Sequence, residues 1–152
     1  MPACSRAASA RAPARRPERR AGGTVLHSRH YTLEEASALL PRVAELIERM
    51  RSARERLGDR EAREALAEAG GTNGGGRPGR VVSEGFLELR ESMLELRGLE
   101  IVLRDLDRGL VDFPALRDDR EVYLCWQEGE DGIAFWHEPD AGFAGRRPLD
   151  DG

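Results

Sequence analysis

Apolar residues recur along residues 33–57 in steps of mostly three and four, the spacing of one face of an α-helix. The stripe comprises Leu33, Ala36, Leu40, Val43, Ile47, Met50 and Leu57. A capping box precedes it, because the Thr32 hydroxyl can accept from an early backbone N–H and the Glu35 carboxylate can reach back. The pattern predicts helix 1 over residues 30–69, with a thinner apolar face beyond Gly58.

A glycine-rich stretch separates this helix from a second one. Six of the ten residues from Gly70 to Gly79 are glycine, which predicts a flexible linker over residues 70–80. A second stripe follows and consists of Val82, Phe86, Leu89, Met93 and Leu96. It predicts helix 2 over residues 83–97, with Ser83 as N-cap and Gly98 as a left-handed C-cap. Two matching stripes joined by a flexible link predict a long antiparallel helical hairpin.

From Glu100 the apolar period changes from helical spacing to two, which indicates β-strands. Residues 122–127 and 133–137 alternate in this way around a short glycine-containing loop, and such a pair is typical of a β-hairpin. An earlier, shorter extended run ends at Pro114. The pattern predicts a β-meander over residues 100–138.

Together the patterns predict a single α+β domain over residues 30–149. In it a long antiparallel helical hairpin packs on a small antiparallel β-sheet, and residues 139–149 form an irregular C-terminal segment. The helical stripe is long for so small a sheet, so we expect part of it to stay exposed in a monomer. Large exposed apolar stripes mark interfaces, and we therefore expect a homodimer that associates through its helices.

Charge is distributed unevenly along the chain. Residues 1–23 hold six arginines and one acidic residue, Glu18, whereas the whole chain carries a net charge of −4. With almost no large apolar residues, residues 1–29 are predicted to be a disordered tail. A nucleic-acid partner is not expected, because a polyphosphate needs a dense positive field and the body of the chain is acidic.

The cysteines and the apolar runs bear on the compartment. Cys4 and Cys125 give neither a disulfide framework nor a zinc quartet, so we expect a reduced protein in which Cys125 is simply packed. No apolar run is long enough to cross a bilayer, and the N-terminus lacks the apolar core of a signal peptide. These features predict a cytoplasmic protein without a membrane partner. The chain contains no lysine, which we interpret as the codon bias of a GC-rich bacterial genome.

Three local motifs do not support the chemistry that they suggest. Residues 74–79 match G-x-G-x-x-G, but they follow a charged helix, whereas a dinucleotide-binding motif follows a strand. His27 and His30 form H-x-x-H without the further ligands that zinc requires. The chain has no G-x-S-x-G elbow, and Cys125 lacks an adjacent base, so the sequence favours a protein that is not an enzyme.

Residues 135–149 concentrate the polar chemistry of the chain. Strand alternation points His137 and Glu138 to opposite faces, so His137 and Asp140, across the turn at Pro139, are the more reachable pair. A planar guanidinium suits anions, which makes Arg146 a candidate anion contact. The candidate ligand-binding residues are His137, Asp140, Arg146 and Asp112, and the candidate metal ligands are His137 and Asp140.

Two interpretations of this stretch remain open beside a purely structural one, in which Trp136 and Phe143 cover the sheet edge. The preferred one is an interaction or ligand-binding module that takes a small anionic or polar ligand, with no cofactor predicted. The alternative is a metal-binding protein or an enzyme that uses His137, Asp140 and Asp112. Histidine titrates near neutrality, and a neighbouring carboxylate raises its basicity.

Several blocks of the sequence carry a family resemblance. The blocks are Tyr31–Ala36, Leu39–Pro41, Asp107–Ala115, Arg120–Trp126 and Trp136–Leu149. In their order and spacing the chain resembles, over residues 31–149, a small prokaryotic family known only as domain of unknown function 2203. The resemblance implies a compact cytosolic protein with a helical pair and a C-terminal strand region. It implies no activity, cofactor or catalytic residue.

Overall fold

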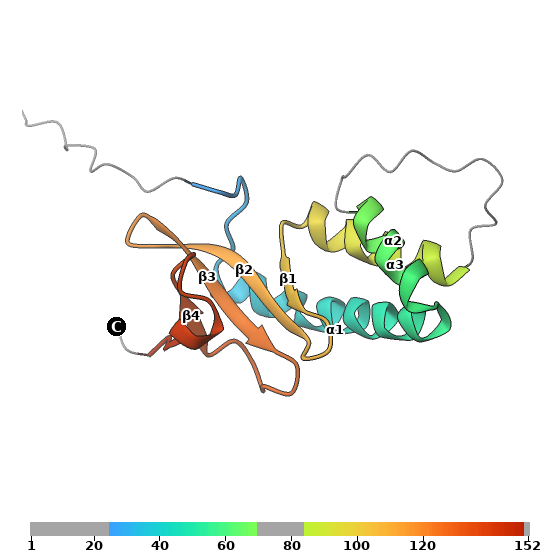
Figure 1. The fold of residues 1–152 in the computed structure, drawn as a ribbon. Helices are drawn as coiled ribbons and strands as arrows, with labels where there is room; N and C mark the ends of the chain where they lie inside the picture. The colour runs from blue at the N-terminus through green and yellow to red at the C-terminus, as the bar shows by residue number, and fades with distance from the viewer. Residues whose placement is uncertain (1–24, 70–83, 151–152) are drawn as a thin grey trace, which may run out of the picture.

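The computed structural model describes residues 25–69 and 84–150, which form an α+β fold with three α-helices and a five-stranded antiparallel sheet (Figure 1). The helices are α1 (Leu33–Arg56), α2 (Asp59–Ala69) and α3 (Glu84–Gly98). The strands are β1 (Val102–Asp105), β2 (Leu110–Arg117), β3 (Arg120–Gln127), β4 (Phe135–His137) and β5 (Arg147–Pro148), paired in chain order. The predicted linker, and most of the predicted tail, lie outside the described residues.

The single helix predicted over residues 30–69 is divided in two. The predicted capping box is confirmed at its start, where the Glu35 N–H donates to Thr32 Oγ1 over 3.1 Å and the Thr32 N–H donates to the Glu35 carboxylate over 2.9 Å. The helix ends because Leu57 adopts an extended conformation (φ −100°, ψ 145°) and buries its side chain. A Cβ atom added at Gly85 of α3 would lie only 3.3 Å from Leu57, so Leu57 packs where α3 has no side chain.

The left-handed residue after α3 is Glu100, and the prediction that Gly98 supplies it is wrong. The Glu100 N–H donates to the Arg97 carbonyl, and the Ile101 N–H donates to the Leu96 carbonyl. This pair of bonds is the Schellman motif, with Glu100 at the position that glycine usually occupies. A side chain is strained there, and the strain is offset by the two bonds that the Glu100 carboxylate accepts from the backbone N–H and hydroxyl of Ser28.

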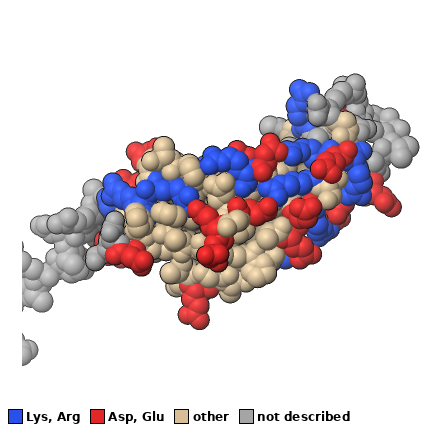
Figure 2. All heavy atoms as spheres, turned by 90° about the horizontal axis from the view of Figure 1, so that it is seen from below, with Lys and Arg blue, Asp and Glu red and all other residues tan. Residues whose placement is uncertain are grey.

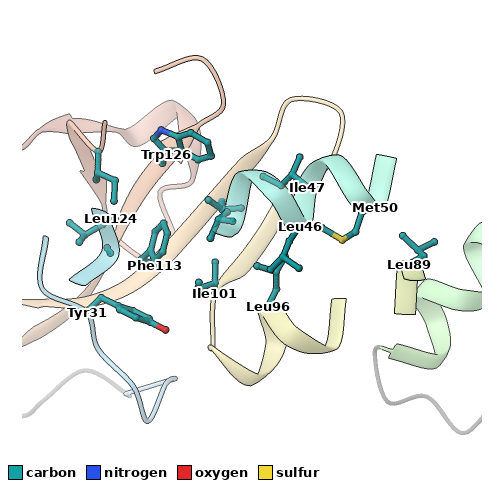
Figure 3. Packing of buried hydrophobic residues seen from close by; sticks show 14 of the residues in the cluster. Tyr31, Leu46, Ile47, Met50, Leu89, Leu96, Ile101, Phe113, Leu124 and Trp126 are labelled. Atoms are coloured by element: carbon teal, nitrogen blue, oxygen red, sulfur yellow. The ribbon is translucent and has the colours of Figure 1, made fainter. Parts of the chain in front are cut away.

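The apolar core lies between α1, α3 and one face of the sheet (Figure 3). Leu46, Ile47 and Met50 of α1 are fully buried, with Leu46 beside Leu96 of α3 and Met50 on the side of Leu89 (Figure 3). The apolar stripe of α1 is therefore covered within the chain itself. Among its members, only Leu33 is exposed. The exposed stripe that motivated the homodimer prediction is thus not found on α1.

Strand β2 continues three residues beyond Pro114, where the sequence predicted its end. Strand β1 pairs only with residues 110–112 of β2. Beyond Asp112, β1 therefore no longer lies beside β2. The N–H and C=O groups of one strand residue point to the same side of the strand. The Pro114 carbonyl points away from β3, because it accepts a bond from the Tyr31 N–H, and the nitrogen of Pro114 therefore also points away from β3. The missing N–H of Pro114 therefore removes no bond from the β2–β3 ladder.

The C-terminal segment is more regular than predicted. Residues 139–149, predicted to be irregular, contain the short 3-10 helix η1 (Phe143–Gly145) and the strand β5. Strand β5 extends the sheet beside β4, with Trp136 opposite Arg147. The guanidinium groups of Arg147 and Arg117 lie 5.4 and 4.6 Å from the centre of the Trp136 ring, which holds this edge of the sheet in place.

Charged side chains join the elements over the surface. Arg42 pairs with Glu95, and Arg49 and Arg56 pair with Glu88, so that α1 and α3 are linked at both ends of their contact. On the face shown in Figure 2, arginines and acidic residues are interspersed. No helix within residues 25–69 and 84–150 combines the length and apolar character needed to cross a membrane.

We predict that Leu46→Ala lowers the free energy of unfolding by about 2–5 kcal/mol, because it opens a cavity in a close-packed core. Leu116→Ala is the matched control, since Leu116 is 54% exposed and its truncation should cost within about 0.5 kcal/mol. Urea denaturation followed by circular dichroism measures both. Equal losses in the two variants would contradict this description of the core.

Candidate functional site

Strand alternation gives the sheet a second, polar face. Residues directly opposite each other in a sheet share a face, and the register pairs Asp112 with Cys125 and Tyr123 with His137. Their immediate neighbours along the strands, such as Phe113 and Leu124, belong to the apolar core. Asp112, Cys125, Tyr123 and His137 therefore lie on the face turned away from the helices, which we call the outer face.

A buried ion pair crosses the outer face from β2 to β4. His137 Nε2 lies 2.9 Å from Asp112 Oδ2, and His137 Nδ1 lies 2.7 Å from the Glu138 carbonyl oxygen. Both partners are acceptors, so both ring nitrogens carry protons and the imidazole is positively charged. Each of the two side chains is about 1% exposed. The pair thus places two opposite charges almost completely out of contact with bulk solvent.

The charges of this pair stabilise each other against the cost of burial. Burial opposes ionisation of Asp112, but hydrogen bonds from His137 and Arg104 outweigh it and lower the pKa of the Asp112 carboxyl. Burial likewise opposes the charged form of His137, but the bonds to Asp112 and Glu138 outweigh it and raise the pKa of the imidazole. The pair is therefore ionised throughout the range between the ordinary pKa values of its two groups, 3.8 and 6.5.

Arg104 reaches the same carboxylate from strand β1. The register between β1 and β2 shifts between Leu103 and Asp105, so Arg104 has no partner on β2. Such an irregularity redirects a side chain, and here the Arg104 Nε donates to Asp112 Oδ2 over 2.7 Å. The Arg104 guanidinium also lies 5.0 Å from the centre of the Tyr123 ring. Asp112 Oδ2 is therefore held by two cations.

The third member of the site is Cys125, which is free and buried. One ligand atom from each of Asp112, Cys125 and His137 lies within 4.8 Å of the other two, and we call these residues the outer-face cluster. Burial, followed by the neighbouring Asp112 charge, raises the pKa of the Cys125 thiol to about 12. Asp112 Oδ1 is buried and accepts no N–H or O–H bond in the part of the chain that the structure describes. The Cys125 thiol is the neighbouring donor, and its hydrogen bond to the carboxylate helps to lower the pKa of Asp112.

A pocket of about 290 Å³ opens above the outer-face cluster. Its walls come from Arg104 and Leu110 and from a turn after β4 that contributes Pro139, Asp140, Gly142 and Phe143. The turn is closed by a bond from the Ala141 N–H to the Glu138 carbonyl. Asp140 is exposed at the rim of the pocket, and it is not a member of the cluster. The structure thus brings His137, Asp112 and Asp140 to one pocket.

Arg146, the fourth predicted site residue, does not line this pocket. Its Nη2 donates to both carboxylate oxygens of Glu130, over 2.7 and 2.8 Å. The guanidinium also lies 4.1 Å from the Phe135 ring centre and 4.7 Å from that of Phe143. Arg146 thereby fastens the wall of the pocket to the sheet, and its charge acts on the outer-face cluster by opposing the rise in the pKa of Cys125.

Sequence reasoning missed Cys125 and Arg104 as parts of the site. Cys125 gave a usable signal, because its strand parity matches that of Tyr123, and a hairpin register places Tyr123 beside His137. Arg104 gave no such signal, because its orientation depends on a register shift that no residue in the sequence of β1 indicates.

Part of the predicted tail is ordered on the same face. Residues 25–30, which we call the N-terminal arm, overlap the tail predicted to be disordered over residues 1–29. The backbone N–H groups of Leu26 and His27 donate to the Glu121 carboxylate, and His30 Nε2 lies 3.0 Å from it. His27 Nε2 lies 2.7 Å from the Tyr123 hydroxyl. Hydrogen bonds to side chains of the sheet thus stabilise the arm, which has few apolar residues to bury.

A family model covers most of this fold. Residues 29–149 match the model of a family described as "Uncharacterized conserved protein (DUF2203)". The chain belongs to this family. A search of curated proteins and a search of solved structures each returned no match. The match confirms the resemblance drawn from the sequence blocks, and the DUF2203 description names no activity.

We predict that Glu121→Gln loosens the N-terminal arm at pH 7, because the carboxylate that accepts bonds from Leu26, His27 and His30 becomes a neutral amide. Burial acts to raise the pKa of Glu121, but bonds from His30, His27 and Leu26 outweigh it and lower the pKa. A lowered pKa means that the stabilisation is present above the ordinary value of 4.5 and is lost as the pH falls through the folded value.

Hydrogen–deuterium exchange of the backbone amides of residues 25–30 measures this effect. We expect faster exchange in Glu121→Gln at pH 7, and the same loosening in the unmodified chain at pH values well below 4.5. Glu91→Gln, which removes an exposed carboxylate on α3, is the control and should leave the arm unchanged. Identical protection in both variants at pH 7 would show that Glu121 does not hold the arm.

Proposed function

We propose that this protein is a metal-binding module that holds one divalent transition-metal ion, of the zinc class, at the outer-face cluster of Asp112, Cys125 and His137. The observation that carries the proposal is the convergence of three ligand atoms within 4.8 Å on buried side chains. Among the described residues Asp112 Oδ1 accepts no N–H or O–H bond, and the Cys125 thiol is its neighbouring donor. A bound cation would replace the thiol proton and satisfy this buried oxygen.

The donor set defines the class of the metal. A thiolate, an imidazole and a carboxylate are ligands that zinc takes in proteins. Calcium and magnesium prefer oxygen ligands alone, so a site with sulfur and nitrogen disfavours them. The sequence suggested His137 and Asp140 as metal ligands. The geometry supports His137 with Asp112 and Cys125 instead, because Asp140 is exposed at the rim.

The surroundings of the cluster would hold the ligands in place before the metal arrives. The bond between His137 Nδ1 and the Glu138 carbonyl fixes the orientation of the ring and leaves Nε2 directed at Asp112. A second hydrogen bond of this kind is the usual support of a metal-ligating histidine. Arg104 bonds to Oδ2 of Asp112, so Oδ1 is the oxygen that can serve a cation.

Metal binding at this site would release protons that Cys125 and His137 carry in the metal-free chain. In the metal-free chain the Cys125 thiol is protonated at neutral pH, since its pKa is raised to about 12. A coordinated cation replaces the thiol proton, because its charge stabilises the thiolate much more strongly than water does. The same cation replaces the proton on His137 Nε2. The thiolate and the Asp112 carboxylate then balance the two charges of the metal.

The test is cobalt binding, because cobalt occupies zinc sites and reports sulfur ligation through a thiolate-to-cobalt charge-transfer band. We expect the chelator-treated full chain to bind one equivalent of cobalt and to show this band. Cys125→Ser should abolish the band, and His137→Ala and Asp112→Asn should each weaken cobalt binding by about tenfold or more, because each removes a ligand.

Two controls separate the site from incidental binding. Cys4→Ser removes the other thiol of the chain, and His30→Ala removes a histidine outside the cluster, and both variants should bind cobalt as the unmodified chain does. Circular dichroism checks that every variant is folded. A folded, unmodified chain that binds no stoichiometric cobalt or zinc would refute the proposed function.

Self-association is a second candidate property, favoured by exposed leucines on α3. We infer that α1 and α3 form a long antiparallel helical hairpin, since Arg42 pairs with the late residue Glu95 and Arg49 with the earlier Glu88. On α3, Leu87 and Leu94 are 42% and 40% exposed and lie seven residues apart. That spacing puts them on one face of the helix, where a second copy of the chain would cover them.

Light scattering at high micromolar concentration tests this association. We expect the unmodified chain to dimerise and the double variant Leu87→Glu, Leu94→Glu to remain monomeric, because charges buried in an apolar interface are costly. Leu116→Glu is the matched control, since Leu116 is 54% exposed on β2, away from α3. A monomeric unmodified chain would exclude the homodimer.

A further inference from the structure

The pocket above the outer-face cluster has room for more than coordinated water. Its volume is about 290 Å³, whereas one water molecule occupies about 30 Å³ in the liquid. Small-molecule sites begin at about 300 Å³. The walls are mainly apolar, from Leu110, Pro139 and Phe143, and the polar groups of the floor are those of the cluster and Arg104. Such a pocket suits a small molecule with one polar end.

The cluster supplies three ligands, which is the number found at zinc sites that keep a position for an exchangeable ligand. Structural zinc sites have four protein ligands. Among the described residues that line the pocket, the remaining carboxylate is Asp140, which is exposed at the rim. The fourth ligand is therefore either Asp140 or a molecule that enters from solvent.

The positive charge of Arg104 at the floor of the pocket favours an oxyanion there. Once the metal is bound, the Asp112 carboxylate and the Cys125 thiolate balance its two charges, Arg104 adds one positive charge beside the cluster, and the exposed Asp140 adds one negative charge at the rim. The Nε of Arg104 is used by Asp112. Its terminal amino groups have no carboxylate partner among residues 25–69 and 84–150. Arg104 also donates to the Tyr123 hydroxyl. A guanidinium held in this way presents its remaining N–H groups to an oxyanion.

We propose that the pocket binds a small molecule through a carboxylate or phosphate group, with one oxygen on the metal and another on the Arg104 guanidinium. This inference rests on the metal site proposed above. The apolar walls would contact the rest of the molecule, and the oxyanion would complete the coordination of the metal. Arg104 is then a ligand-binding residue in addition to its role in positioning Asp112.

The experiment uses the full chain saturated with cobalt and follows the visible absorption of the metal. Inorganic phosphate and acetate are titrated separately as probes. We expect a saturable spectral change with at least one probe, and the concentration at half-saturation should rise by about tenfold or more in Arg104→Gln, because a charge-assisted contact is lost. Arg104→Lys retains the charge without the fork and should fall between the two.

Arg90→Gln, which changes an exposed arginine on α3, is the matched control and should titrate like the unmodified chain. All titrations are made at cobalt saturation, so a weaker metal affinity in an Arg104 variant does not imitate weaker anion binding. The thiolate-to-cobalt band confirms in each variant that the metal is in place.

Three results would overturn the inference. If cobalt binds but neither probe alters its spectrum, the pocket takes no oxyanion, and the metal-binding function still stands. If in addition Asp140→Asn alters the cobalt spectrum without any probe, Asp140 is the fourth ligand. If the probes act equally on the unmodified chain and on Arg104→Gln, the anion binds without Arg104. Absence of the cobalt band in the unmodified chain would refute the metal site and this inference together.

Discussion

The ion pair between Asp112 and His137 is the constraint on which the outer face depends. It joins β2 to β4 across β3, and it buries two charges that neither strand could hold alone. Removing Asp112 would leave the buried charge of His137 uncompensated, which typically costs several kcal/mol, whereas removing His137 would leave Asp112 paired with Arg104. The pair thereby fixes the position of β4, and with it the turn that forms the wall of the pocket.

The sheet has two kinds of core, one on each face. The face toward α1 and α3 is apolar and contributes most of the hydrophobic burial. The outer face is polar, and it is buried because two chain segments cover it: the N-terminal arm lies over Glu121 and Tyr123, and the turn after His137 lies over Cys125. Burial on this face depends on matched hydrogen bonds, whereas burial on the other depends on packing.

These two faces explain how so small a domain carries a candidate site. The main apolar core lies on the helix side, so the outer face can keep a cysteine, a carboxylate and an imidazole close together. Arg104 and Arg146 have different structural roles. Arg104 is bonded to the cluster itself, while Arg146 is stacked between Phe135 and Phe143 and holds the pocket wall.

The sequence by itself determined the α+β class, the capping box at Thr32 and the β3–β4 hairpin, because local periodicity and capping depend on neighbouring residues. It also showed that polar side chains are concentrated around His137. The tertiary structure decided the break at Leu57, the extension of β2 through Pro114, the ordering of residues 25–29 and the union of Cys125 with Asp112 and His137. Each of these depends on partners far along the chain, on strand register, or on a bulge. The pattern of residues within a short segment does not indicate such contacts.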